Sequence, residues 1–393
     1  MNFLAEKTNI PSSATLQLLD RVKELKRAGH EVISLSAGEP DFVTPEHIRT
    51  YAKRALDDGY TFYPESAGLL ELRGAIADKL HRDNAIETDP KKQIVVTVGG
   101  KEAIYAALMA TVNPGDEVIV LDPCWVSYVP CILLAGGKPV YVPANASRGF
   151  GISTELLEAA ITKRTKMLII NTPNNPTGSI IARDNLEAIA DLAKHKGFLV
   201  LSDELYEKII FDSKVHVSIG SLPGMEDFTV TVNGFSKAYA MTGWRLGYLA
   251  APSSIAERVT AIHGHMVTGA CTFAQRAIAQ AMRDDLTETA VKEMVTEYSR
   301  RRDLVVNELG RFTGVKCTKP QGTFYAFPNI SHYGLRSADF AMKLLDEAKV
   351  AVVPGDSFGG KGEGYIRLSF ATSRDNLATA FARMRSVMSE AQN

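Results

Sequence analysis

The sequence has few cysteines, almost no net charge and no long apolar run, and each shortage removes a class of protein. Four of the 393 residues are cysteine and no two form a CxxC pair, so the chain is not a small domain held together by disulfides. The 44 basic and 45 acidic residues leave a net charge of −1, which excludes the basic field of a dedicated nucleic-acid binder.

Neither membrane insertion nor secretion is indicated. The longest apolar runs, such as 166–170, fall far short of the about 18 residues that a membrane-spanning helix needs. Residues 1–7 lack the basic and apolar regions of a signal peptide. Unpaired cysteines suit a reducing compartment, so we expect a cytoplasmic protein with no membrane partner. The length predicts about two to three domains.

The middle of the chain alternates short apolar runs with helical patterns such as 101–112 and 182–194. Seven runs are rich in Val, Ile and Leu and predict strands at 93–98, 117–121, 139–142, 167–170, 199–201, 229–232 and 246–250. They show no alternation of polar and apolar residues, which indicates strands buried on both faces. Strands that alternate with helices predict an α/β fold with a mostly parallel sheet flanked by helices.

The last hundred residues are different and predict a smaller α+β domain. Charged helices are expected at about 287–309, 337–348 and 374–389, with strands at 322–327 and 365–370. The N-terminal forty residues, with one helix at about 14–28 and a strand, are expected to pack against it. The expected division is 1–45, 46–285 and 286–393. Arg300–Arg302 is interpreted as the solvated face of a helix.

Two motifs follow predicted strands, where open α/β sheets bind ligands. In the segment 98–103 a strand ends in two glycines before a helix begins, which is either a tight turn or an anion site at a helix N-terminus. The segment 171–178 is rich in Asn and Pro and is either a structural turn or a source of an amide donor, Asn175, for an oxyanion.

Two further motifs place charged side chains at strand ends. Asp203 ends a buried strand, where a carboxylate is costly unless paired; it is either a helix N-cap or the partner of a buried cation such as a protonated ring nitrogen. Lys237 follows the next strand in a mostly uncharged segment, where loss of water would depress its pKa and make it a nucleophile. Ser236 and Arg245 cluster with it among glycines, which favours a functional interpretation.

Two other motifs are set aside. The run Gly355–Lys361 fits most of a phosphate-binding P-loop, but Gly362 stands where Ser or Thr is needed and a strand pattern follows, so ATP binding is not favoured. His263 and His265 have no cysteine or carboxylate near them in sequence, and we expect packing or pocket residues instead of metal ligands.

Taken together, the motifs resemble the class I and II aminotransferases of pyridoxal-phosphate fold type I, and among them the aspartate-aminotransferase-like group. Segments that match in the family's order are 38–42, 63–68, 99–101, 125–128, 174–178, 202–206, 236–245 and 365–369. They span nearly the whole chain and include Lys237, Arg245 and Arg367. The resemblance implies a large domain with a mostly parallel seven-stranded sheet, a smaller α+β domain, and pyridoxal 5′-phosphate as cofactor.

The resemblance also implies roles for individual residues around the cofactor ring. Lys237 matches the lysine that bonds to the cofactor and moves a proton at the substrate Cα. Asp203 matches the partner of the pyridine N–H, and Trp125 the aromatic that stacks on the ring. Tyr206 and Asn175 match the donors to its phenolic oxygen. The expected catalytic residues are Lys237, Asp203 and Tyr206.

For the phosphate group and the substrate, the resemblance implies a second set of contacts. Backbone N–H groups of Gly100 and Lys101 and the side chains of Ser236 and Arg245 are expected to bind the phosphate. Tyr63 matches a tyrosine that reaches it across a dimer interface, which implies a homodimer. The expected substrate-binding residues are Gly38, Trp125, Asn175 and Arg367, with Arg367 as the clamp of the α-carboxylate.

Three departures from the family bear on substrate and cofactor. Gly234 stands where many relatives carry a phosphate-binding serine, segment 261–271 lacks the expected Ser, Gln and Thr, and no second arginine matches a clamp for a distal carboxylate. The resemblance implies ping-pong transfer of an amino group from an L-amino acid to a 2-oxo acid such as 2-oxoglutarate. Aspartate is the expected donor, with aromatic or other amino acids open. The alternative is a C–S lyase, β-lyase or decarboxylase on the same fold.

Overall fold

The computed structural model describes residues 8, 10 and 14–390 of the chain. Segment 1–7, where the sequence shows no signal-peptide pattern, lies outside the described residues. Within the described part, every helix is too short or too polar to cross a membrane.

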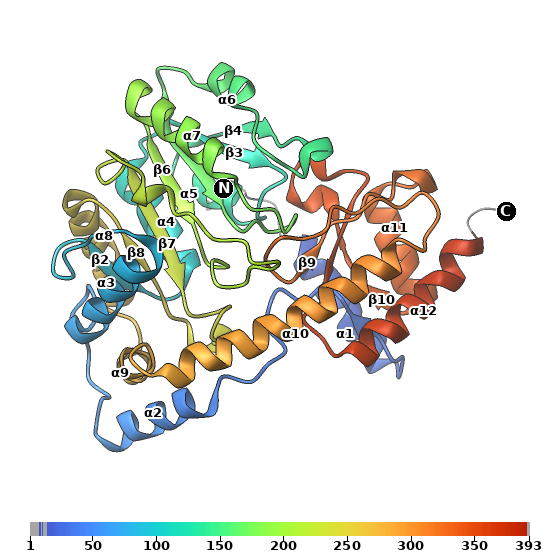
Figure 1. Cartoon of the computed structure of the whole chain (residues 1–393), viewed down its shortest axis with the longest axis horizontal. Coiled ribbons are helices and arrows are strands. Elements are labelled where there is room, and N and C mark those ends of the chain that lie inside the picture. Colours follow the sequence, from blue (N-terminus) through green and yellow to red (C-terminus); the bar gives the residue numbers. More distant parts are fainter. Residues whose placement is uncertain (1–7, 9, 11–13, 391–393) are drawn as a thin grey trace, which may run out of the picture.

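A seven-stranded sheet forms the centre of the larger part of the molecule (Figure 1). Its strands are β2 (Ile94–Thr97), β3 (Glu117–Asp122), β4 (Lys138–Pro143), β5 (Thr165–Asn171), β6 (Leu199–Asp203), β7 (Thr229–Gly234) and β8 (Gly247–Ala250). The order is β2-β8-β7-β6-β5-β3-β4, and β8 runs in the direction opposite to the other six strands. Each of the seven apolar runs is one of these strands, which confirms the mostly parallel sheet.

Helices cover both faces of this sheet, which explains why its strands lack alternation. Val118 and Val120 of β3 pack with α4 (Gly100–Thr111) and α8 (Ser253–Val267). Ile119 and Leu121 of the same strand pack on the opposite side with α6 (Thr154–Ala160) and α7 (Arg183–Lys196). Both faces therefore need apolar side chains, and the carboxyl ends of the strands remain as the open edge.

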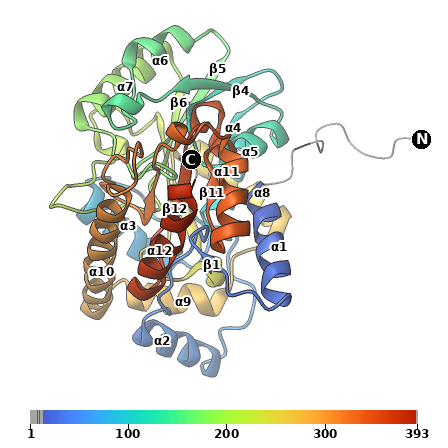
Figure 2. The ribbon, with the colours of Figure 1, turned by 90° about the vertical axis from the view of Figure 1, so that its right-hand side faces the viewer.

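The smaller part combines both ends of the chain. Strands β11 (Val353–Pro354), β12 (Ile366–Ser369) and β9 (Tyr325–Ala326) form an antiparallel sheet, and β1 (Ile33–Ser34) pairs in parallel with β10 (Val350–Ala351). In Figure 2 helix α1 (Ala14–Arg27, blue) lies in the same part of the molecule as α11 (Ser337–Lys343, orange), and its Leu18 and Val22 share a hydrophobic cluster with Leu345 and Val353.

The remaining α-helices lie in both parts. They are α2 (Glu46–Asp57), α3 (Leu70–Asn84), α5 (Tyr128–Leu134), α9 (Thr272–Ala281), α10 (Asp285–Leu309) and α12 (Arg374–Glu390). Helix α10 runs along both parts in Figure 1 and touches α2 as well as α12. The strand expected at 322–327 is reduced to β9, because Thr323 has a φ of +63° and the backbone N–H of Gly322 donates to Gly178 instead.

One interpretation of α10 is wrong. Arg301 and Arg302 are 6% and 1% exposed, so most of the run Arg300–Arg302 is not a solvated face. Arg301 pairs with Asp41 at 2.8 Å and Arg302 with Asp212 at 2.8 Å. Both partners come from distant loops, which helical periodicity does not reveal.

Candidate active site

Asn175, Asp203 and Lys237 meet at one edge of the sheet, because β5, β6 and β7 are parallel neighbours and each residue lies at or just after a strand's carboxyl end. Asn171, the last residue of β5, ties two of these ends together. Its side chain donates to the Asp203 backbone oxygen at 3.0 Å and accepts the Asn175 N–H at 2.8 Å. These two hydrogen bonds of Asn171 hold the ends of β5 and β6 together, so that Asn175 and Asp203 belong to one cluster.

Asp203 is a buried carboxylate that the described residues do not neutralise with an ion pair. One oxygen accepts the Tyr128 hydroxyl at 2.6 Å and the other accepts the Leu205 N–H at 3.3 Å. Burial raises its pKa to about 6. No α-helix begins at this turn, so the N-cap interpretation is not supported. A cation such as a protonated ring nitrogen fits this carboxylate.

Lys237 lies in the turn after β7, and its amine points toward the segment that carries Gly38. The Nζ donates to the Gly38 oxygen at 2.5 Å and lies 5.8 Å from the centre of the Tyr206 ring. Burial, and then the positive charge of Arg367, lower its pKa to about 8. An amine with a pKa near the working pH both attacks carbonyl carbons and transfers protons.

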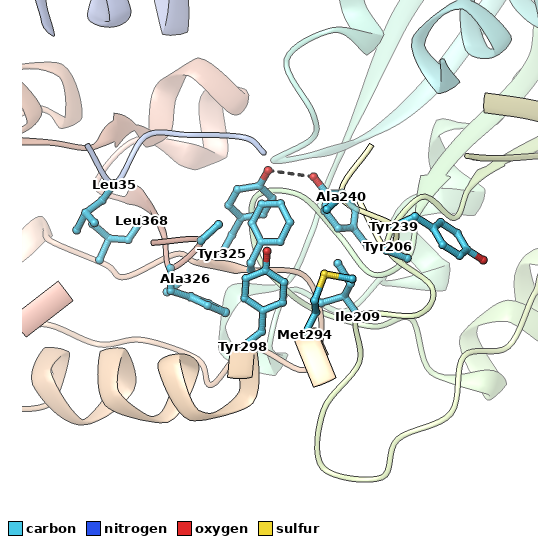
Figure 3. Packing of buried hydrophobic residues seen from close by; sticks show 14 of the residues in the cluster. Leu35, Tyr206, Ile209, Tyr239, Ala240, Met294, Tyr298, Tyr325, Ala326 and Leu368 are labelled. Carbon is cyan, nitrogen blue, oxygen red and sulfur yellow. Dashed lines mark hydrogen bonds between the residues drawn. The ribbon is translucent and has the colours of Figure 1, made fainter. Parts of the chain in front are cut away.

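The Tyr206 hydroxyl lies 3.0 Å from the hydroxyl of Tyr325 (Figure 3). Tyr325 belongs to β9 of the smaller sheet, and its ring centre is 4.3 Å from the Arg367 guanidinium. Tyr325 was missed by the sequence analysis because it stands in a short strand with no motif of its own. Tyr128 was quoted in a matching motif, but its contact with Asp203 depends on the fold.

Arg367 on β12 is a buried cation for which the described residues supply no carboxylate. It is 4% exposed and donates to the Asn175 Oδ1 at 3.0 Å and the Ser36 oxygen at 2.9 Å. Its Nε has no hydrogen-bond partner among the described residues, and its ring neighbours are Tyr325 and Phe358. Burial lowers its pKa. A carboxylate ligand would satisfy both the charge and the fork of donors.

A turn between β2 and α4 presents backbone N–H groups at a helix N-terminus. Gly99 has a φ of +82°, and a Cβ there would lie 2.5 Å from the Arg245 Nη2. Arg245 is held over the turn by bonds to the backbone oxygens of Thr242 and Val98. The helix N-terminus and the guanidinium together fit a phosphate group.

The presence of glycine at position 234 has a steric explanation. Gly234 pairs with Gly247 across β7 and β8, and a Cβ on Gly234 would lie 3.0 Å from the Gly247 Cα. A Cβ on Gly247 would in turn lie 2.5 Å from the Gly100 nitrogen. The backbone of the candidate phosphate site is therefore packed against a strand pair without side chains, and a serine at 234 would need these strands to move apart.

The remaining expected residues differ in how close they come to this cluster. Trp125 packs edge-on against Tyr128 with centroids 5.3 Å apart, and the Lys101 Nζ lies 5.2 Å from the centre of the Trp125 ring. Ser236 is 4% exposed and adjoins Lys237. Tyr63 is not brought into the cluster: it is 88% exposed and borders a surface hollow of about 440 Å³ with residues 60–64 and 269–273.

A buried ionic cluster lies on the other side of β6 from Asp203, because successive residues of a strand point to opposite faces. Glu204, Glu207 and His216 bring their ligand atoms within 4.8 Å of one another. Lys79 pairs with Glu207, and Asn84 donates to both carboxylates. Lys79 supplies a cation for Glu207, and the His216 Nε2 lies 2.9 Å from a carboxylate oxygen of Glu204. The sequence offered no motif for this cluster.

His263, expected as a packing or pocket residue, is fully buried, and its Nδ1 lies 2.7 Å from a carboxylate oxygen of Glu102.

The chain is similar to aminotransferases over most of its length. The family model "Aminotransferase class I and II" matches residues 30–384. The chain is 50% identical to an aspartate aminotransferase of Pyrococcus abyssi, with 92% of each chain covered. It is 48% identical to aromatic-amino-acid aminotransferase 2 of Thermococcus litoralis, covering 91% of this chain and 92% of that protein.

The fold agrees with these matches. A structure of Thermus thermophilus aspartate aminotransferase with maleate superposes with a TM-score of 0.94 at 40% identity, covering 98% of this chain and 100% of that one. The residues at the strand ends offer a nucleophilic amine, an unneutralised carboxylate and an anion-binding turn, as pyridoxal phosphate requires. The chain therefore belongs to the class I and II aminotransferases, pyridoxal-phosphate enzymes that move an amino group from an amino acid to a 2-oxo acid.

Proposed function

We propose that the cluster at the carboxyl ends of β5, β6 and β7 is the active site of this aminotransferase. The observation that carries the proposal is the combination of two buried groups and one partly buried amine, none of which has an ion-pair partner among the described residues. They are the Asp203 carboxylate, the Lys237 amine and the Arg367 guanidinium, and each matches a different part of the cofactor or substrate.

For the cofactor, Asp203 would bind the protonated ring nitrogen, and Trp125 would stack on the ring. The side-chain oxygen of Asn175 accepts a hydrogen bond from Arg367, so its amide N–H groups are left to donate to the phenolic oxygen of the cofactor. The hydroxyl of Tyr206 would be the second donor to that oxygen. The phosphate would bind to the backbone of Gly100 and Lys101 and to the side chains of Ser236 and Arg245. Support comes from Arg245, whose guanidinium lies against Gly99 and donates to the Val98 oxygen in the turn after β2.

When bound, the cofactor supplies an electrophilic carbon and a ring that withdraws electrons from the substrate. The chain supplies the proton transfer and the orientation. Lys237, with its pKa of about 8, takes a proton from the substrate Cα and returns it, which is general acid–base work near neutral pH. The Gly38 oxygen orients the amine, and Arg367 holds the α-carboxylate so that the Cα faces Lys237.

We propose a dicarboxylic amino acid, aspartate above all, as the amino donor, with 2-oxoglutarate as acceptor. Support comes from the relative with aspartate in its name and from Lys101, an exposed cation beside Trp125 that the substrate's second carboxylate could reach. The relative named for aromatic amino acids makes an aromatic donor the second candidate, because a ring could pack where Trp125 and Lys101 lie.

A spectral titration tests this proposal. Holoenzyme without any oxo acid is mixed with single amino acids, and loss of the absorbance of the lysine-bound cofactor is followed. Bleaching by aspartate, weakened in Lys101→Met, supports the dicarboxylate; bleaching by tyrosine or phenylalanine alone supports the aromatic candidate. Release of pyruvate, ammonia or carbon dioxide without bleaching would support the lyase or decarboxylase alternative.

A homodimer would complete the site. Phe62 and Tyr63 are 82% and 88% exposed, and large exposed aromatics beside a hollow are typical of a surface that a partner covers. The partner's Tyr63 would then reach the phosphate. Light scattering should give twice the chain mass of 42.8 kDa, and Tyr63→Phe should weaken cofactor binding without dissociating the dimer. A monomer that binds the cofactor fully would contradict this part.

Domain division and location complete the proposal. The pairing of β1 with β10 supports a small domain made of 1–45 and 286–393, with 46–285 as the large domain. All four cysteines are free thiols, which supports a reducing compartment, the cytoplasm.

A further inference from the structure

The run Gly355–Lys361, which resembles a phosphate-binding loop, encloses a carboxylate of the chain itself. It forms two short 3₁₀ turns, Gly355–Phe358 and Gly360–Gly362, between β11 and β12. The Lys361 backbone N–H lies 3.1 and 3.2 Å from the two carboxylate oxygens of Asp122. Gly359 has a φ of +127°, and a Cβ there would lie 2.2 Å from the Asp122 Oδ1. Glycine is therefore needed for the approach of the carboxylate.

The enclosed carboxylate comes from the other part of the molecule. Asp122 is the last residue of β3 in the seven-stranded sheet and is 7% exposed. Two residues later, the Cys124 N–H donates to the Phe358 oxygen at 2.8 Å. The loop 355–362 is thus bound to the end of β3 by one contact through a side chain and one through the backbone.

This loop supports the residue that we assign to the substrate carboxylate. The Phe358 side chain is 1% exposed and its ring centre lies 5.0 Å from the Arg367 guanidinium. Arg367 itself is on β12, the strand that follows the loop. On the other side, Asp122 is three residues before Trp125, which is expected to stack on the cofactor ring. The contact therefore joins the substrate side of the site to the cofactor side.

We propose that Asp122 is a positioning residue for Arg367: its carboxylate holds the loop 355–362 against β3 and thereby keeps Phe358 beneath the guanidinium. This inference rests on the proposed role of Arg367 in substrate binding. The carboxylate is preferred to a neutral amide at this position because both of its oxygens accept, and the N–H of Lys361 faces both.

Asp122→Asn tests the proposal in the holoenzyme. The amide keeps the size of the side chain but turns a donor toward the Lys361 N–H. The expected result is a rise of about tenfold in KM for both the amino acid and the oxo acid, which is the factor that a hydrogen bond to a charged group contributes, with kcat and cofactor affinity unchanged. Amide hydrogen exchange in 355–362 should become faster, which reports on the contact without activity.

Two further variants separate the backbone contact from other effects. Lys361→Ala removes the ammonium but keeps the N–H, and should leave KM and exchange within twofold of the parent enzyme. Gly359→Ala places a methyl group against the carboxylate while Asp122 is intact, and should reproduce the rise in KM. Circular dichroism and thermal melting check that each variant is folded.

The outcomes distinguish this proposal from the proposed function. Faster exchange in Asp122→Asn with unchanged KM would overturn the positioning role, and unchanged exchange would overturn the contact itself. An effect of Lys361→Ala as large as that of Asp122→Asn would show a side-chain ion pair in place of the enclosed carboxylate. If Arg367→Lys leaves KM unchanged, the assignment of Arg367 fails, independently of the exchange result.

Discussion

The Arg367 guanidinium donates a 3.0 Å hydrogen bond to the side-chain oxygen of Asn175. The two residues stand 192 positions apart, one on β12 of the smaller sheet and the other in the loop after β5. The bond links the group proposed for the substrate carboxylate to a group proposed for the cofactor ring. It also fixes the orientation of the Asn175 amide, so that its N–H groups are left to donate.

Replacing Lys237 by alanine should leave the fold intact and abolish transamination. The variant loses the amine that exchanges the Cα proton, and general acid–base catalysis of this kind contributes a factor of about 10²–10⁴. Single-turnover measurements with aspartate and cofactor give the rate. Lys361→Ala, a lysine outside the cluster, serves as control, and substantial turnover in Lys237→Ala would refute the assignment.

Replacing Arg367 by alanine should weaken substrate binding by about 2–5 kcal/mol, the cost of truncating one member of a buried charged pair. The loss should appear as a raised KM for every amino acid and oxo acid, because all of them carry the α-carboxylate. Arg374→Ala is the matched control, since Arg374 forms an exposed pair with Glu297. Equal KM values in the two variants would point to another clamp.

Replacing His216 by glutamine should destabilise the fold in a way that depends on pH. Burial alone lowers the pKa of His216, but the charge of and hydrogen bond to Glu204 more than offset this, so the pKa lies above 6.5. A raised folded-state pKa gives stability that is complete below the unfolded pKa and is lost as the pH rises through the folded value.

The expected loss for His216→Gln is about 3–5 kcal/mol at pH 6, the effect of leaving a buried carboxylate without its charged partner, and it should shrink by pH 9. Urea unfolding at both pH values measures it. His195→Gln on the exposed face of α7 should change little. A loss that is the same at both pH values would mean that His216 is neutral in the folded protein.

Replacing Gly234 by serine, the residue that the family resemblance leads us to expect there, should destabilise this chain instead of improving cofactor binding. The added Cβ would meet the Gly247 Cα at 3.0 Å, and overpacking of this kind costs about 1–3 kcal/mol. Thermal unfolding and cofactor titration are the measurements. Gly74→Ser, where a Cβ meets no atom within 4 Å, is the control. Tighter cofactor binding at unchanged stability would contradict the steric explanation.

The positions of the seven strands, and of the polar residues at their ends, could be predicted from the amino-acid sequence. Local hydrophobic runs identify strands that are buried on both faces, and a polar residue that directly follows such a strand must lie at the sheet edge where Asp203 and Lys237 are found. The order of motifs then identified the family, because the motif residues stand next to regular elements that periodicity can locate.

Contacts between side chains that are distant in the sequence could not be predicted and depend on the packing of the folded chain. The hydroxyls of Tyr325 and Tyr206 form a hydrogen bond, and the Asp122 carboxylate accepts the backbone N–H of Lys361 in the loop 355–362. Arg302 forms an ion pair with Asp212. Each contact joins segments 90 or more positions apart through loops or short strands, and such pairings depend on how whole elements pack. Hydrophobic periodicity predicts which face of a single helix or strand is buried. It does not predict which charged group, distant in the sequence, will pair with a charged side chain on that element.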